Sequence, residues 1–119
     1  MRTRKSPYEC GLDAAVDVIG GKWKVLLLWA LQSGPRRFGE LKRDVPAVSE
    51  KVLIQQLREM EEDRIVHREV YHQVPPKVEY SLTELGMSLS AALEPLGMWG
   101  REHMAELEAT YDSRHPRAS

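Results

Sequence analysis

The sequence predicts one mainly α-helical domain that carries a single small β-hairpin. Apolar residues recur at α-helical spacing along most of the chain, whereas residues 65–83 change to the alternation of β-strands. The 119 residues are 42% hydrophobic and 29% charged, as is typical of one soluble globular domain. We expect residues 10–111 to form this domain, between a flexible arm of residues 1–9 and a disordered polar tail of residues 112–119.

Two apolar helices are predicted first. The apolar residues of 12–19 fall on one helical face, and Gly20-Gly21 ends that helix. Residues 22–32 are apolar on nearly all sides, which favours a buried central helix. Ser33-Gly34-Pro35 then stops it.

Two more polar helices follow. Residues 38–45 form a short helix with Leu41 and Val45 inward, and Pro46 breaks it. Ser49 is a favourable N-cap for a helix that runs to about Asp63. Its predicted inward side chains are Leu53, Leu57 and Met60, and those on the opposite face are Lys51, Gln55, Arg58 and Glu62.

Residues 65–72 and 77–83 are predicted to pair as a hairpin. In the second strand the apolar residues Val78, Tyr80 and Leu82 alternate with polar ones. The connection, residues 73–76, ends in two prolines, which fix φ and donate no ladder hydrogen bond.

A long helix is predicted last. Thr83 caps it and Glu84 lies in its first turn, which suits the helix dipole. Apolar residues keep the helical spacing to Leu107, although Pro95 is expected to kink or split the segment. If continuous to Tyr111, the helix would be ~43 Å long, which leaves apolar surface for a partner to cover.

The order of these elements is that of a winged helix-turn-helix. In that fold the helix after Ser49 is the recognition helix, whose N-terminal part meets base edges in the major groove. Arginine and lysine suit guanine or phosphate, and glutamine suits adenine. The hairpin is the wing, which reaches phosphates or the minor groove, and the acids within residues 59–63 must then lie away from DNA. The predicted DNA-binding residues are Arg37, Ser49, Lys51, Gln55, Gln56, Arg58, Arg68, His72 and Lys77.

Charge is unevenly distributed along the chain. Residues 1–58 carry eleven Lys or Arg and six Asp or Glu, whereas residues 59–119 carry six and twelve. A basic half indicates a polyanionic partner, but charge blocks are equally typical of solvated faces, and the net charge is −1. The pattern alone therefore leaves open both DNA binding and a winged helix that binds only protein partners.

Four motifs carry a resemblance to the HxlR-type transcriptional regulators, and they occur in family order and spacing over about residues 8–105. They are Ile19-Gly20-Gly21-Lys22-Trp23, Arg37-Phe38-Gly39-Glu40-Leu41, residues 49–57 and residues 74–83.

The resemblance implies a MarR-like winged helix homodimer, clasped by the first and last helices. It also implies a regulator that represses or activates transcription from operator DNA. We expect a repressor on a palindromic operator, with half-sites one helical turn apart, ~34–36 Å. The predicted dimerisation residues are Leu12, Val16, Leu89, Leu93, Leu96 and Trp99.

The chain departs from the family pattern at three places. Ile54 stands where members usually have Thr, which affects operator preference. Asp63-Arg64 stands where Asp-Gly is frequent, so a favourable left-handed residue is missing at the helix end. Cys10-Gly11 replaces the usual Cys-Pro.

Cys10 matches the offset at which some members of the family sense oxidants or electrophiles. It precedes the first helix, whose N-terminus favours a thiolate, and basic residues lie at positions 2, 4 and 5. The alternative is a small side chain at a dimer seam without chemistry. Redox sensing by Cys10 is therefore a hypothesis.

Two other groups of residues have a functional and a structural interpretation. Trp23, Trp29 and Trp99 would line an effector pocket, for an effector that the sequence does not identify, or belong to the core. The four histidines lack the spacing of a zinc site, so we expect no metal.

Several classes of protein are disfavoured. Glycine-rich phosphate loops, nucleophile elbows and His-Glu-x-x-His motifs are missing from the sequence, so we expect neither an enzyme nor a cofactor. The longest apolar run, residues 25–31, is too short for a membrane helix, and we expect no secretory signal, because no apolar segment follows the basic first residues. A single cysteine cannot form an internal disulfide, which favours a cytoplasmic location.

Overall fold

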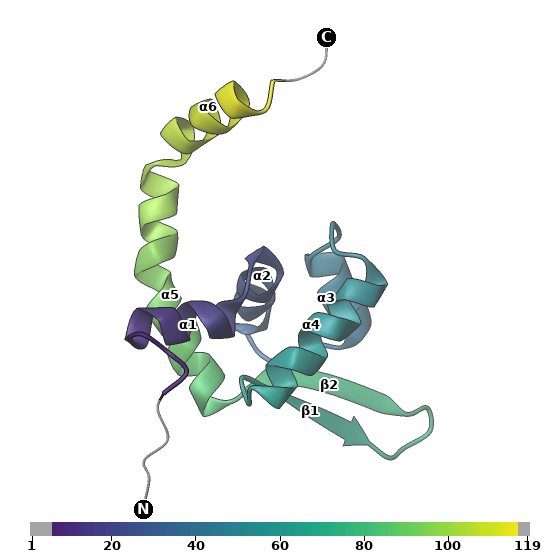
Figure 1. Ribbon diagram of the computed structural model, residues 1–119. Helices are drawn as coiled ribbons and strands as arrows, with labels where there is room; N and C mark the ends of the chain where they lie inside the picture. Colours follow the sequence, from purple (N-terminus) through teal and green to yellow (C-terminus); the bar gives the residue numbers. More distant parts are fainter. Residues whose placement is uncertain (1–5, 117–119) are drawn as a thin grey trace, which may run out of the picture. The chain divides into compact units, whose positions relative to one another are not determined.

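The computed structural model describes residues 6–116 and contains the predicted elements in the predicted order (Figure 1). The elements are α1 (Gly11–Ile19), α2 (Lys22–Leu31), α3 (Phe38–Asp44), α4 (Glu50–Glu62), β1 (Val66–Tyr71), β2 (Lys77–Leu82), α5 (Glu84–Glu102) and α6 (Met104–Arg114). They belong to two compact units, residues 1–87 and 88–119, and α5 begins in the first and continues into the second. Residues 1–5 of the predicted arm and 117–119 of the predicted tail lie outside the described residues.

The core of the first unit lies among α2, α3, α4 and the hairpin. The inward face of α4 is as predicted, because Leu53, Leu57 and Met60 are at most 2% exposed. From α2, the buried leucines are Leu27, Leu28 and Leu31.

The predicted buried central helix, α2, is buried only in part. Trp29 is 66% exposed, and Val25 and Leu26 are 37% and 39% exposed. The elements that pack against α2 are α1, α3, α4 and β2, and they cover its leucines Leu27, Leu28 and Leu31 rather than this face.

Helix α4 has a defined signal at each end. At its start, Ser49 Oγ accepts a hydrogen bond from Val52 N at 3.2 Å, as predicted. At its end, Arg64 N donates to Glu61 O and Ile65 N donates to Met60 O. This is the Schellman pattern, which requires a left-handed residue at its centre, and Arg64 has a φ of 61°.

Arg64→Gly is expected to stabilise the protein by about 1 kcal/mol, because glycine adopts this φ without the steric cost of a Cβ atom. Urea unfolding monitored by circular dichroism measures the effect. Arg64→Ala is the control, since it removes the same side chain but keeps Cβ, and an equal gain in both variants would contradict the explanation.

The hairpin pairs β1 with β2 in antiparallel register, from Val66 opposite Leu82 to Tyr71 opposite Lys77. Arg36 adds a short bridge on the other edge of β2, through two backbone hydrogen bonds with Tyr80 of 2.8 and 2.9 Å. The expected burial alternation in β2 is absent, because all six residues are half-buried. Its polar face is partly covered by the hairpin itself, where Lys77 lies between Glu79 and the Tyr71 ring.

Helix α5 starts at the predicted cap, where Thr83 Oγ1 accepts a hydrogen bond from Gly86 N at 3.0 Å. Pro95 does not split this helix, which continues to Glu102. The interruption falls instead at His103, whose backbone N donates to Trp99 O and whose Nδ1 lies 2.8 Å from that same oxygen. Proline removes one helical donor, a loss that this helix tolerates, whereas the His103 backbone leaves the helical region, with φ −109° and ψ 12°.

Helix α6 reaches Arg114, so residues 112–114 of the predicted disordered tail are helical. His115, the residue after this helix, is held against it. Its backbone N donates to Tyr111 O, and its ring stacks on the Tyr111 ring with centroids 4.1 Å apart. Within residues 6–116, no helix is both long and apolar enough to cross a membrane.

Candidate nucleic-acid interface

Helices α3 and α4 form the helix-turn-helix of the first unit, and the hairpin follows directly from α4 (Figure 1). The turn between them is anchored by two buried valines, Val45 at 5% and Val48 at 1% exposure. Because these side chains fix the turn to the core, the first turns of α4 start from a defined position.

The outward face of α4 carries the polar side chains that the periodicity predicted. Lys51, Gln55 and Arg58 are exposed, whereas Gln56 is half-buried. The Ser49 hydroxyl serves as the N-cap of the helix, so its oxygen already accepts one hydrogen bond from the backbone.

A chain of hydrogen bonds links this outward face to the core. Lys24 of α2 is only 6% exposed, and its Nζ donates to Glu59 Oε1 at 2.8 Å. The other carboxylate oxygen, Glu59 Oε2, accepts from Gln55 Nε2 at 2.9 Å. The hydrogen bonds from Lys24 and then from Gln55 lower the pKa of Glu59, which favours its charged form.

Sequence reasoning missed the roles of Lys24 and Glu59. Glu59 was grouped with the acids turned away from DNA, although it contacts the predicted base-reading Gln55. One signal was available in the sequence: Lys24 is a charged residue within an apolar helix. A charge that is buried with such a helix needs a partner of opposite charge.

Two predicted DNA-binding arginines, one on a helix and one on a strand, line the same cavity. Arg58 of α4 and Arg68 of β1 line one cavity of about 340 Å³ between the helix and the hairpin. The remaining lining residues are Ile54, Leu57, Glu61 and Tyr80.

The two predicted basic residues near the tip of the wing differ in their surroundings. His72 is exposed. Lys77 Nζ lies 3.6 Å from Glu79 Oε2 and 4.7 Å from the centroid of the Tyr71 ring, so the hairpin itself partners this cation. A hydrogen bond to Glu79 raises the pKa of Tyr71, which remains a neutral phenol beside it.

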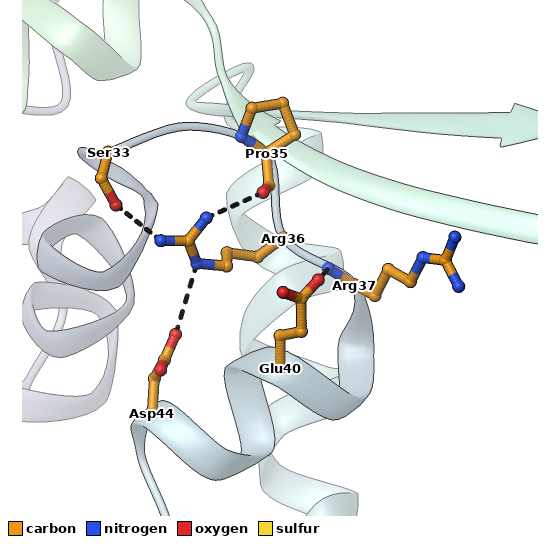
Figure 2. A network of polar contacts seen from close by, with 6 residues as sticks. All are labelled: Ser33, Pro35, Arg36, Arg37, Glu40 and Asp44. Carbon is orange, nitrogen blue, oxygen red and sulfur yellow. Dashed lines mark hydrogen bonds and ion pairs between the residues drawn. The ribbon is translucent and has the colours of Figure 1, made fainter.

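Neighbouring arginines at the start of α3 have different contacts (Figure 2). The Arg36 guanidinium donates to Ser33 Oγ at 2.6 Å and Pro35 O at 3.1 Å, and its Nε lies 3.6 Å from Asp44 Oδ2. Figure 2 shows the Arg37 guanidinium pointing away from this network, while its backbone N donates to Glu40 Oε1 at 3.0 Å. Arg36 therefore holds the loop, and Arg37 is presented to solvent.

Arg37→Ala and Arg36→Ala are expected to have different effects. If Arg37 contacts a DNA phosphate as predicted, Arg37→Ala is expected to weaken DNA binding about eightfold at 0.1 M salt, with little change in stability. Loss of the Arg36 contacts destabilises the fold by about 1 kcal/mol. Fluorescence anisotropy measures the DNA affinity of both variants, and urea unfolding measures their stability. An unchanged DNA affinity of Arg37→Ala would exclude a contact between Arg37 and a phosphate.

Cys10 is exposed and directly precedes α1, where its carbonyl oxygen accepts from Ala14 N at 3.1 Å. The basic residues expected near it, at positions 2, 4 and 5, lie outside the described residues. The described neighbours in sequence are acidic: Glu9 N donates to Asp13 Oδ2, and the Tyr8 hydroxyl donates to Asp17 Oδ2.

The residues predicted for dimerisation are apolar and mostly exposed. On α1, Leu12 is 74% and Val16 is 54% exposed. On α5, Leu96 and Trp99 are 60% and 51% exposed, whereas Leu89 and Leu93 are half-buried. The large apolar residues of α5 and α6 that are exposed but that the prediction did not include are Leu85, Met87, Met98, Met104, Leu107 and Tyr111.

The three tryptophans considered for an effector pocket have separate local contacts. Trp23 lies beneath Lys22 Nζ, 4.6 Å from the ring centroid, and Trp99 stacks on His103 at 4.7 Å. Trp29 lines a cavity of about 230 Å³ with Ala30, Gln32, Ser33, Arg36 and Asp44. The effector pocket stays a prediction.

Residues 18–108 match the model of the HxlR-like helix-turn-helix family. The chain belongs to this HxlR family. Two Bacillus subtilis relatives are similar over most of their length. The HTH-type transcriptional regulator YkvN is 54% identical over 93 residues, 78% of this chain and 79% of the relative. The HTH-type transcriptional regulator YybR is 49% identical over 113 residues, 92% of this chain and 90% of the relative.

Solved structures also resemble this HxlR protein. The redox regulator HypR in its reduced form superposes with a TM-score of 0.79 at 48% identity, over 84% of this chain and 99% of that chain. The structure of diamide-treated YodB from B. subtilis superposes with a TM-score of 0.69 at 35% identity, over 78% of this chain and 93% of that chain. The prediction of a winged helix-turn-helix transcriptional regulator is thereby confirmed.

Proposed function

We propose that this HxlR-family regulator is a homodimeric repressor that binds a palindromic operator, with α4 in the major groove and the hairpin on the adjacent backbone or minor groove. One observation carries the proposal: Lys51, Gln55 and Arg58 are exposed on one face of the Ser49-capped α4. Arg37 at the start of α3 and Arg68 on β1 add cationic groups for phosphates on the neighbouring elements.

The exposed apolar residues of α1, α5 and α6 support a dimer. Large apolar side chains exposed on a monomer often mark an interface, and Leu12 on α1 and Leu96 and Trp99 on α5 are each more than half exposed. A two-fold dimer would place its two copies of α4 in successive major grooves on one face of the DNA, so half-sites ~34–36 Å apart are expected.

Fluorescence anisotropy tests the function directly. The protein is titrated against the DNA upstream of its own gene and a scrambled duplex, over a series of salt concentrations, with its mass measured by sedimentation. Tighter binding to the native duplex with a steep loss of affinity in salt supports the proposal, because counterion release follows phosphate contact. Failure to bind either duplex at low salt contradicts it and favours a protein partner.

We further propose that Cys10 makes DNA binding redox-responsive. The support is its exposure at the start of α1 and the resemblance to HypR, a redox regulator, and to YodB, whose structure was solved after diamide treatment. Because the sequence holds one cysteine, any disulfide must join Cys10 to a second molecule, either another chain or a small thiol.

Diamide is expected to change the operator affinity of the wild type by about 5- to 150-fold, the usual range for coupled sites. The Cys10→Ser variant is expected to keep its affinity under the same treatment. Anisotropy titrations with and without diamide, followed by non-reducing electrophoresis, measure both the response and the disulfide. Superimposable curves for wild type and Cys10→Ser would end the redox hypothesis.

A further inference from the structure

The Lys24, Glu59 and Gln55 side chains form a chain that begins in the core and ends on the proposed DNA-binding face. Lys24 anchors it, because this cation is 6% exposed and its Nζ lies 2.8 Å from Glu59 Oε1. Glu59 is thereby tied to α2, and its second oxygen lies 2.9 Å from Gln55 Nε2. Gln55 itself is exposed, one helical turn after Lys51.

The chemistry of these groups determines how the Gln55 amide is turned. A charged carboxylate only accepts hydrogen bonds, so the NH₂ group of Gln55 must face Glu59. The carbonyl oxygen, Gln55 Oε1, is then turned away from Glu59. One of the two amide hydrogens is used by Glu59, and the other remains available beside Oε1.

We propose that Lys24 and Glu59 are positioning residues that hold Gln55 with its carbonyl oxygen toward the bases, so that Gln55 selects adenine at the position it contacts. This inference rests on the proposed operator binding. Adenine offers the N6 amine to Oε1 and the N7 acceptor to the remaining amide hydrogen. Cytosine offers only its N4 amine, and guanine and thymine present acceptor oxygens, so these bases rank below adenine.

Without the anchor, the Gln55 amide can rotate by half a turn and present its NH₂ group to guanine O6 or thymine O4. A glutamine at position 59 is both a donor and an acceptor, so it accommodates either orientation of Gln55. Glu59→Gln is therefore expected to reduce discrimination at one base position without removing the base contact.

Selection from a randomised duplex library, with the full-length protein and sequencing of the bound DNA, measures this. The variants are Gln55→Ala and Glu59→Gln, and the control is Glu62→Gln, which makes the same chemical change on an exposed position of the same helix. Wild type and Glu62→Gln are expected to select adenine, then cytosine, at one position of each half-site. Gln55→Ala loses this preference, and Glu59→Gln weakens it about fivefold, as for one hydrogen bond.

Glu59→Gln leaves the buried Lys24 without its carboxylate, so folding is checked by thermal unfolding. If that variant unfolds, Lys24→Met combined with Glu59→Gln removes both charges and is subjected to the same selection. An unchanged adenine preference in the folded variant overturns the positioning role, and selection of guanine or thymine by the wild type overturns the proposed orientation. If the wild type enriches no sequence, operator binding itself fails, and this proposal fails with it.

Discussion

Gly86→Ala is expected to destabilise the protein by about 3 kcal/mol, the upper end of the usual cost of forcing a methyl group into a packed site. Gly86 lies in the first turn of α5, at the point where this helix meets the end of α4. A Cβ atom at this position would overlap the carbonyl oxygen of Ile65 and lie 3.1 Å from its carbonyl carbon.

The junction around Gly86 has little freedom to move aside. Thr83 N donates to Ile65 O at 3.0 Å, and Thr83 Oγ1 donates to Arg64 O at 2.6 Å while accepting from Gly86 N. The Ile65 side chain is 3% exposed, so its backbone cannot shift without opening the core. The strain therefore appears as lost stability.

Urea unfolding monitored by circular dichroism measures the loss, which corresponds to a fall of more than about 10 °C in melting temperature for a unit of this size. Gly100→Ala is the matched control, because it makes the same change in the same helix where a Cβ meets nothing within 4 Å. That control is expected to gain up to about 1 kcal/mol from helix propensity. Equal behaviour of the two variants would contradict the steric explanation.

Elements with local signals could be predicted from the sequence almost to the residue. Ser49 fixes the start of α4, and the two prolines of residues 73–76 separate two strands that pair as predicted. Arg64 stands where the family pattern favours glycine, and the structure gives it the left-handed φ of 61° that this position after a helix end requires. Such signals act over a few residues, which is the range that a single sequence reveals.

Features that depend on distant contacts could not be predicted. The exposed face of α2 depends on which elements pack around that helix. In the candidate site, the sequence alone does not distinguish Arg36 from Arg37, although Arg36 holds a loop and Arg37 faces solvent. The contact of Lys24 with Glu59 joins residues 35 positions apart, and neither residue carries a local motif.

Arg58→Ala combined with Arg68→Ala is expected to weaken DNA binding about 60-fold at 0.1 M salt, because two lost phosphate contacts reduce the salt slope by about 1.8. The two arginines come from α4 and β1 and line the same cavity. A DNA backbone that follows both the recognition helix and the wing would pass this position. Neither guanidinium is needed for the core, so stability should change little.

Anisotropy titrations over a salt series give the slope as well as the affinity, and both are needed for the interpretation. Arg101→Ala combined with Arg114→Ala is the control, since it removes the same charge from α5 and α6. If only the net charge of the protein mattered, the two double variants would lose equal affinity. If the salt dependence of DNA affinity is reduced only in the Arg58 and Arg68 double variant, the phosphates lie beside the cavity between α4 and the hairpin. If that salt dependence is unchanged, the DNA binds elsewhere on this chain.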